Sequence, residues 1–261
     1  MKAARLRPSD YAPLMRMALS EDLGRAGDLT TQFFVPPKTR LQGRIVSREA
    51  GAVCGLKVAA AVFRACEPRA KIRLLLRDGT RVRPGRAVMA VSGGRGLLTA
   101  ERTALNFLQR MSGVASLTRR YVDRVRGTRA RILDTRKTLP GWRVLDKYAV
   151  ACGGGVNHRM GLSDAVMVKD NHYLGRGLET GARELRRRHP GGVLHPPALL
   201  EEIPELFPGR LEPFSREDAH LDGLARALPH CRGVDGGLPE SVRNLIIFPV
   251  QELKQPTPSF P

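Results

Sequence analysis

The sequence predicts an α/β protein in which a mixed α+β unit precedes a parallel α/β barrel or open sheet. Two observations predict this class. Over residues 130–172, short apolar stretches that end in charged residues alternate with a helix-length amphipathic stretch, as in parallel strands joined by helices. Residues 1–95 instead combine helical stretches with short strands and turns. We therefore expect one domain over residues 1–100, to which C-terminal elements can return, and a second over residues 101–261 that is poorly defined after about residue 178.

The first unit contains two predicted helices and two strand regions. In chain order these are a helix over 9–24, short strands around a turn over 42–56, a helix over 56–68, and strand, Asp-Gly turn and strand over 71–93. Ser9 or Asp10 is the expected N-cap of the first helix, and Gly24 ends it. Pro68 stops the second helix because its ring cannot continue the helical hydrogen bonding.

A long helical region opens the second part, and strands alternating with a helix follow it. In chain order we expect a helical region over 97–127, a strand over 130–137, a helix over 143–155, an extended piece over 156–161 and a strand over 164–172. The alternation then fades, because 12 of the 19 prolines lie in residues 179–261 and proline cannot donate to a sheet ladder. We therefore expect irregular chain beyond about residue 190, except for a helix over 217–228, and a C-terminal tail that does not fold.

The charge of the chain is strongly positive and unevenly distributed. Residues 1–178 hold 34 basic and 13 acidic residues, a net of +21, whereas residues 179–261 hold 10 and 12, a net of −2. Such a field favours anionic partners, either nucleic acids or small phosphorylated and carboxylated metabolites.

The sequence also predicts where the protein is found. No apolar run reaches the roughly 18 residues that a membrane span needs, and the first residues lack the apolar segment of a signal peptide. The four cysteines lack metal-binding spacing. We expect a cytoplasmic protein with reduced thiols and no membrane partner.

Five basic groups follow the predicted strands and form the main candidate site. They are Arg136, Lys137, His158, Arg159 and Lys169. Because the carboxyl ends of parallel strands meet on one face, these groups can surround one pocket. Arginine offers paired donors and lysine a compact charge, so the pocket suits a small molecule with carboxylates, phosphates or both. The alternative is that they are solvated surface charges or members of salt bridges.

Two other features have both a functional and a structural interpretation. Arg102 lies on a predicted helix and, from composition alone, is a surface arginine. Gly153, Gly154 and Gly155 either let the backbone approach a ligand closely or simply end a helix.

Long stretches of the chain resemble quinolinate phosphoribosyltransferases. The resemblance covers about residues 15–175 and rests on EDLGRAGDLTT, SREAGAVCGL, DGTRVRPG, LLTAERTALNFLQRMSGVAS and DTRKTLPGWRVLDKYAVACGGGVNHRMGLSDAVMVKDNH. It implies an N-terminal α/β sandwich and an incomplete, open α/β barrel. It also implies a reaction: quinolinate attacks phosphoribosyl pyrophosphate with Mg²⁺ as cofactor, and pyrophosphate and CO₂ leave as nicotinate mononucleotide forms.

The resemblance also implies roles for individual residues. Substrate-binding residues would be Arg102, Thr135, Arg136, Lys137, His158, Arg159 and Lys169, with Lys137 and Lys169 as the catalytic cations. Arg102 would reach the active site of the other subunit of a homodimer.

The last third departs from the family pattern. In the segment LEPFS, Glu212 stands where the family has Asp and Pro213 where it has Asn. Gly236 and Gly237 are the candidate phosphate loop, and Glu212 is the one candidate metal ligand, the metal ligands being otherwise unknown. The family's closing strand and second phosphate loop have no counterpart. The quinolinate half of the site therefore looks intact and the phosphoribosyl half damaged.

Four functions follow from these features. The first is an active quinolinate phosphoribosyltransferase, and the second is a decayed, weakly active or inactive copy of it. The third is a related phosphoribosyltransferase acting on another acidic ring. The fourth is a nucleic-acid-binding protein, which only the charge supports, since no binding fold is recognisable and aromatic residues make up 5% of the chain.

Overall fold

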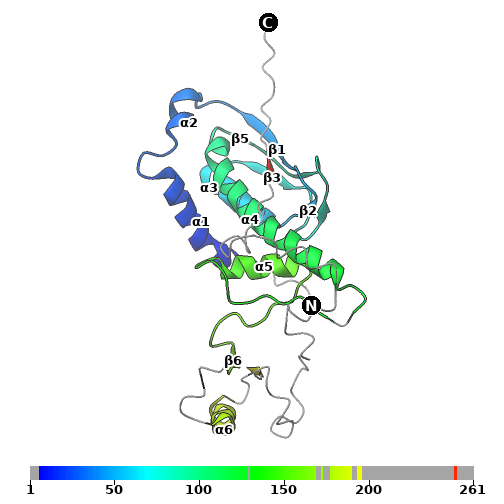
Figure 1. Cartoon of the computed structure of the whole chain (residues 1–261). Helices are drawn as coiled ribbons and strands as arrows, with labels where there is room; N and C mark the ends of the chain where they lie inside the picture. Colours follow the sequence, from blue (N-terminus) through cyan, green and yellow to red (C-terminus); the bar gives the residue numbers. More distant parts are fainter. Residues whose placement is uncertain are drawn as a thin grey trace, which may run out of the picture. The chain divides into compact units, whose positions relative to one another are not determined.

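The computed structural model describes residues 6–128, 130–168, 172, 177–189, 193–195 and 250–251. The chain forms two compact units, of which the first comprises Met1–Gly127, Ile132–Asn157 and Pro239–Pro261, and the second Thr128–Arg131 and His158–Leu238 (Figure 1). Residue 100, at which we divide the domains from the sequence, lies within helix α4 (Gly96–Arg124); that division stays a prediction.

An antiparallel sheet of four strands forms one layer of the first unit. Its order is β3-β5-β1-β8, with bounds β3 (Lys71–Leu74), β5 (Ala87–Gly93), β1 (Leu41–Ser47) and β8 (Val250–Gln251). In the central pair Leu41 lies opposite Gly93 and Ile45 opposite Met89, and a bulge follows Ile45. Val250 pairs with Ser47 and Gln251 with Val46, so the expectation of an unfolded tail is wrong at residues 250–251.

The Asp-Gly turn predicted within residues 71–93 is present, but the stretch after it forms two strands instead of one, and the second of them, β5, pairs with β3. Gly79 has a φ of +84° in this turn, a conformation that favours glycine. The strand after the turn, β4 (Arg81–Val82), pairs with β2 (Gly51–Ala52), whereas β3 pairs with β5. Pairing is thus decided by partners distant in sequence.

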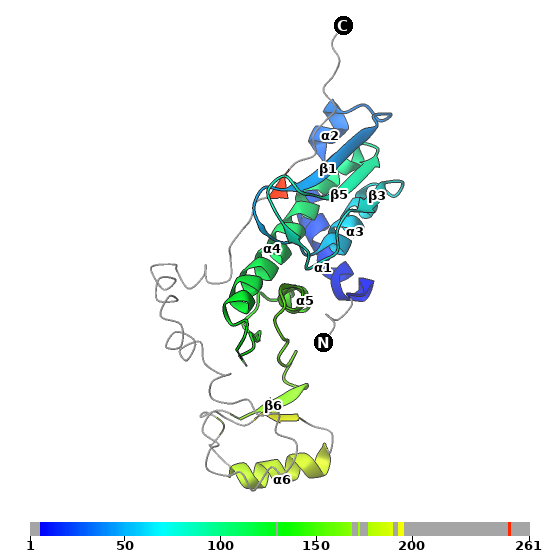
Figure 2. The ribbon, with the colours of Figure 1, turned by 90° about the vertical axis from the view of Figure 1, so that its right-hand side faces the viewer.

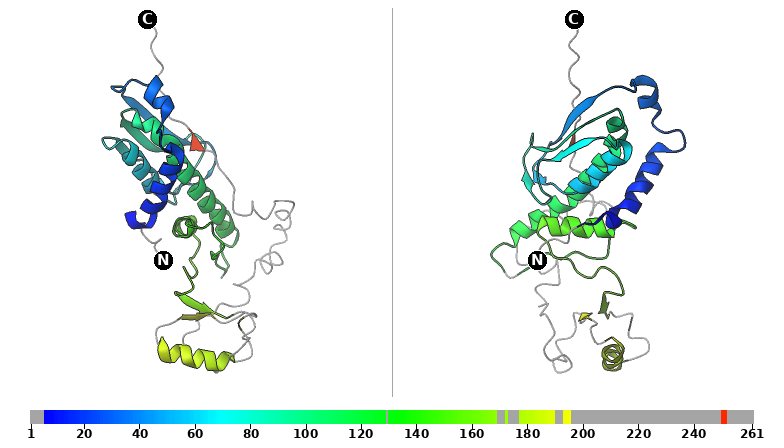
Figure 3. Two further views of the ribbon diagram at one scale, coloured as in Figure 1. Left: turned by 90° about the vertical axis from the view of Figure 1, so that its left-hand side faces the viewer. Right: turned by 180° about the vertical axis from the view of Figure 1, so that it is seen from behind.

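Helices form the second layer of this unit (Figures 2 and 3). They are α1 (Pro8–Leu23), α2 (Leu29–Phe34), α3 (Leu56–Cys66), α4 and α5 (Arg143–Gly153). Apolar side chains of α3 and α4, such as Phe63 and Phe107, are buried in one core with Ile45 and Met89 of the sheet. The helical region predicted over 97–127 is one continuous helix, α4, which runs through the centre of the unit.

The start of α1 differs from the prediction. Its N-cap is Arg7, and Asp10 lies at the third helical position, where its carboxylate accepts a hydrogen bond of 2.8 Å from the Arg7 backbone N–H. Asp10 thus satisfies an orphan donor from inside the first turn instead of from the cap. Gly24 ends the helix as predicted.

The second unit contains a parallel strand–helix–strand. Strand β6 (Ala165–Met167) pairs in parallel with β7 (Val193–His195), and α6 (Leu178–Arg188) lies between them in sequence. The expectation of irregular chain beyond residue 190 is therefore wrong at residues 193–195, where the strand ends just before Pro196. The fold class is α/β, as predicted. Among the described residues, no helix is long and apolar enough to span a membrane.

Candidate functional site

A single parallel bridge anchors the segment that carries Thr135, Arg136 and Lys137. Leu133 bridges Val156, whose N–H donates to the Ile132 carbonyl at 2.8 Å. The Asp134 N–H donates to the Val156 carbonyl at 3.1 Å. The strand predicted over 130–137 is thus reduced to this bridge, and the three candidate residues directly follow it.

These three residues present donors at the end of the bridge. Thr135 and Lys137 are exposed, and the Thr135 hydroxyl accepts a hydrogen bond of 3.1 Å from the Lys137 backbone N–H. Arg136 is half-buried, and its Nε is buried without a hydrogen-bond partner among the residues the structure describes. A buried, unused donor on an arginine is what an anionic ligand can satisfy.

A buried polar cluster lies directly beneath this segment. Lys147 of α5 and Asp134 form an ion pair whose side chains are 2% and 6% exposed. The Asn157 amide donates to the other carboxylate oxygen of Asp134 at 2.6 Å and to the Lys147 carbonyl at 2.8 Å. We call Asp134, Lys147 and Asn157 the buried triad after the buried side chains of Asp134 and Lys147; Asn157 is half-buried. Our reading of the sequence missed all three, although Asp134 directly precedes the segment Thr135–Arg136–Lys137 and Asn157 directly precedes His158.

His158 and Arg159 belong to the second unit and are half-buried there. Arg159 Nη1 donates to the Ala165 carbonyl at 2.8 Å, which ties it to the start of β6. The Met160 N–H donates to the Asp164 carboxylate at 2.6 Å and closes the turn between them. Arg159 therefore lies at a defined place next to β6, a strand of the parallel pair.

The glycine run is a helix end that packs against α4. Gly154 has a φ of +94°, and the N–H groups of Gly154 and Gly155 donate to carbonyls of the last turn of α5, as in a Schellman-type cap. A Cβ on Gly153 would lie 2.6 Å from the Ala115 carbonyl oxygen. Of the two interpretations left open by the sequence, the structure supports the helix cap.

Arg102 is exposed on α4, and the same helix borders a hollow of the first unit. The hollow has a volume of about 790 Å³, and Thr99, one helical turn before Arg102, lines it. The charged residues around it are Asp28, Lys38, Arg40, Glu67, Arg69 and Arg95. Because residues three apart share a helix face, Arg102 adds a further cation beside a hollow in which cations outnumber carboxylates.

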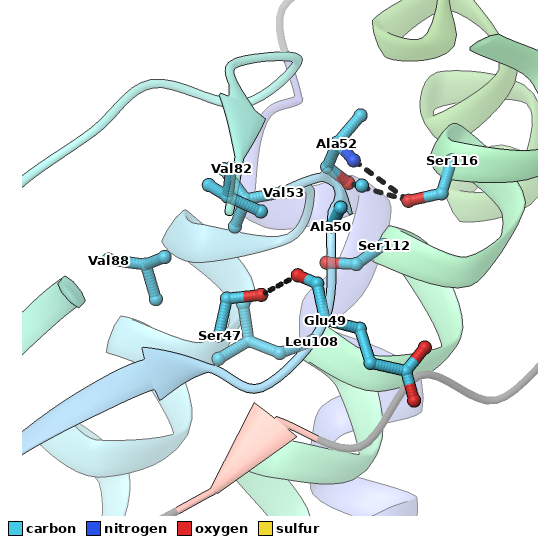
Figure 4. Close-up of a pocket in the computed structure, with 11 residues that line it drawn as sticks. Ser47, Glu49, Ala50, Ala52, Val53, Val82, Val88, Leu108, Ser112 and Ser116 are labelled. Carbon is cyan, nitrogen blue, oxygen red and sulfur yellow. Dashed lines mark hydrogen bonds between the residues drawn. The ribbon is translucent and has the colours of Figure 1, made fainter. Parts of the chain in front are cut away.

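A second cavity in this unit is too small for a substrate. It measures about 20 Å³, room for roughly one water. Val53, Val82, Val88 and Leu108 line it, and the only polar contacts that Figure 4 draws bind side chains to the backbone, such as Ser47 Oγ to the Glu49 carbonyl at 2.6 Å. It is a packing gap between β1 and α4.

Burial also shifts the pKa of carboxylates that serve the fold. It raises the pKa of Asp78, although the Leu56 N–H and the Tyr148 hydroxyl donate to that carboxylate at 3.0 and 2.9 Å. It likewise raises the pKa of Asp146, against the stabilising charge of Arg110 at 2.8 Å. Both carboxylates have protein partners and hold helices in place.

The remaining candidates lie outside the described residues. They are Lys169, Glu212, Gly236 and Gly237. Within the part of the chain that is described, no group of three or more His, Cys, Asp or Glu side chains could hold a metal ion.

Comparison with known proteins gives one consistent family. A family model described as the N-terminal domain of quinolinate phosphoribosyl transferase matches residues 28–112, and one described as its C-terminal domain matches residues 114–193. The nicotinate-nucleotide pyrophosphorylase [carboxylating] of Mycobacterium leprae is 46% identical over 205 residues, covering 74% of this chain and 72% of that protein. A probable enzyme of the same name from Synechocystis is 39% identical over 220 residues, covering 83% and 74%.

Solved structures agree with the sequence matches. The nicotinate-nucleotide pyrophosphorylase of Francisella tularensis has a TM-score of 0.71 at 33% identity, covering 75% of this chain and 70% of that one. The corresponding protein of Ehrlichia chaffeensis has a TM-score of 0.67 at 34% identity, covering 74% and 70%. The buried triad and the cationic segments all fall within the matched residues.

Proposed function

Because this chain belongs to the quinolinate phosphoribosyltransferase family, we propose that it transfers the phosphoribosyl group of phosphoribosyl pyrophosphate to quinolinate with loss of CO₂. The products are nicotinate mononucleotide and pyrophosphate, which places the reaction in NAD biosynthesis. One observation of the structure carries the proposal. The segment Thr135–Arg136–Lys137 follows the bridge at Leu133, and the Nε of Arg136 is a buried donor without a partner among the described residues.

Quinolinate requires cations, since it brings two carboxylates to the site. We assign its binding to Arg136, His158, Arg159 and Lys169, with Thr135 assisting through its hydroxyl. Arg136 supports this assignment because its guanidinium can bind a carboxylate through two parallel hydrogen bonds. Lys137 and Lys169 are proposed as the catalytic cations.

The main tasks of the protein in this reaction are to position the substrates and to neutralise their charges. The transition state at the sugar carbon is expected to be loose and cationic, so no protein nucleophile is needed. Loss of CO₂ leaves an electron pair on the ring carbon, which takes up a proton. A lysine ammonium next to that carbon stabilises this electron pair. We assign this stabilising role to Lys137 and Lys169.

Mg²⁺ is part of the proposed reaction as the ion that neutralises pyrophosphate. Among the described residues, no group of three or more His, Cys, Asp or Glu side chains is placed to hold it. Glu212 stays the candidate ligand.

A homodimer with shared sites is the proposed assembly, and the cytoplasm the proposed location. Arg102 supports the dimer because it is exposed on α4, one helical turn after Thr99, which lines the cationic hollow of the first unit. Quinolinate and phosphoribosyl pyrophosphate are the proposed ligands, with neither nucleic acid nor membrane as partner.

A quinolinate-binding chain with weak turnover is the second candidate. One observation favours it: the family match ends at residue 193, before Glu212 and Pro213 replace the family's acid–amide pair.

One assay separates the two candidates. Nicotinate mononucleotide is measured from quinolinate, phosphoribosyl pyrophosphate and Mg²⁺, beside calorimetric binding of quinolinate alone. Turnover of roughly 1 per second or faster supports the full reaction. Binding with turnover far below that supports the second candidate, and no binding of quinolinate contradicts both.

A further inference from the structure

Two cation-bearing segments of the proposed site start from the same buried cluster. Asp134 is bonded in sequence to Thr135, and Asn157 is bonded in sequence to His158. Both Asp134 and Asn157 belong to the buried triad. Each cationic segment therefore begins one peptide bond away from a side chain that is held inside the first unit.

The contacts of the triad link three stretches of chain. Asp134 uses one carboxylate oxygen for Lys147 and the other for Asn157, at 2.6 Å. The Asn157 amide also donates to the Lys147 backbone carbonyl at 2.8 Å. The Asp134 N–H closes the arrangement by donating to the Val156 carbonyl at 3.1 Å. These contacts thus link the segment at Leu133 and Asp134, helix α5, and the segment that precedes His158.

The burial of this cluster is unusual for charged groups. Lysine is almost never fully buried unless it is paired, and the Lys147 side chain, which is 2% exposed, has Asp134 as its partner. Its neighbours on α5, Leu145 and Ala149, belong to the apolar core. A buried ion pair often adds no more stability than a well-packed apolar pair would. Stability alone therefore does not account for charges at this position, whereas fixing the direction of two segments does.

We propose that Asp134, Lys147 and Asn157 are positioning residues, which hold the starting points of the two cation-bearing segments for quinolinate. They do not touch substrate themselves. The consequence for quinolinate rests on the proposed function, whereas the bracing of the segments does not.

The same helix offers a matched control. Asp146, next to Lys147 on α5, forms another buried ion pair, with Arg110 of α4, and the two side chains are 10% and 13% exposed. Neither Asp146 nor Arg110 is next to a candidate cation in sequence. Loss of this pair tests what a weakened α5 does by itself.

The main experiment compares Asn157→Leu with Asp146→Asn. Asn157→Leu removes both amide hydrogen bonds and leaves the ion pair in place. We expect it to fold, to bind quinolinate roughly tenfold more weakly by calorimetry, and to exchange backbone amides faster in peptides covering 135–138 and 156–160. Asp146→Asn is expected to lower the melting temperature while leaving that affinity and that exchange within about twofold.

A double variant, Asp134→Leu with Lys147→Met, removes both charges at once. Since apolar residues can replace a buried pair without loss of stability, it is expected to melt near the wild-type temperature and still bind quinolinate about tenfold more weakly. Wild-type affinity in this variant, or unchanged exchange in Asn157→Leu, would overturn the proposal. If the wild-type chain binds no quinolinate, the proposed function fails, and the exchange comparison still decides whether the triad braces the two segments.

Discussion

Arg136 is the candidate binding residue whose surroundings lead to the most specific prediction. It follows a bridged strand end, it is half-buried, and its Nε has no partner among the described residues. We expect Arg136→Ala to weaken quinolinate binding by roughly ten- to a hundredfold, about 1.5–3 kcal/mol for one charge-assisted contact. Calorimetry on the folded variant measures this. Arg120→Ala, an exposed arginine on α4, is the control, and equal effects of the two would mean that only net charge matters.

Single glycines in the helices differ in what a side chain would meet. A Cβ at Gly153 would lie 2.6 Å from both the Ala115 carbonyl oxygen and the Thr118 Cβ, whereas one at Gly181 in α6 meets nothing within 4 Å. Gly153→Ala should therefore destabilise by about 1–3 kcal/mol through overpacking. Gly181→Ala should stabilise by roughly 0.5–1 kcal/mol, since alanine favours helix. Urea unfolding of both variants checks the opposite signs, and equal effects would show that α4 and α5 can move apart.

At the scale of elements, α2 depends on a capping carboxylate that also binds α4. Asp28 accepts hydrogen bonds from the Thr31 N–H at 2.9 Å and from the Thr99 hydroxyl at 2.8 Å. Burial on its own would raise the pKa of Asp28, but these hydrogen bonds outweigh it and hold the pKa below the ordinary value of 3.8. A carboxylate with a lowered pKa stabilises the fold above its unfolded pKa, and this stabilisation is lost as the pH falls through the folded pKa.

Replacement of this cap gives a pH-dependent prediction. Asp28→Ala is expected to cost about 1 kcal/mol at neutral pH. The difference from the wild type should shrink as the pH falls below 3.8 towards the folded pKa. Asp28→Asn, which keeps an acceptor without a charge, should retain most of the stability at neutral pH. Denaturant unfolding across this range is the measurement, and a deficit of Asp28→Ala that is constant with pH would exclude the charged cap.

At the scale of the whole molecule, the proposed dimer makes a prediction about mixed chains. If Arg102 acts in the partner's site, a chain with Arg102→Ala and a chain with Arg136→Ala each lack every complete site. Random exchange of subunits should then restore about a quarter of the sites, because half of the dimers are mixed and each has one complete site. Quinolinate binding before and after mixing measures this. Failure of the mixture to recover any binding would place Arg102 in its own chain's site or outside the site.

The sequence by itself determined the features that depend on neighbours in the chain. The helices predicted over 9–24, 56–68 and 143–155, the end of the first at Gly24, and the place of the cations after apolar stretches all follow from local patterns of apolar, glycine and proline residues. The family resemblance likewise rests on continuous sequence motifs, and the comparisons confirm it.

Only the tertiary structure decided which distant segments meet. It paired β3 with β5 instead of β4, and it buried Lys147 against Asp134 and Asn157, 13 and 10 residues away. It also showed that the glycine run packs on α4. The physical reason is that burial and strand pairing depend on which surfaces become neighbours after folding. A buried lysine has the same local sequence signature as a solvated one, so its role became visible only when its partners were in place.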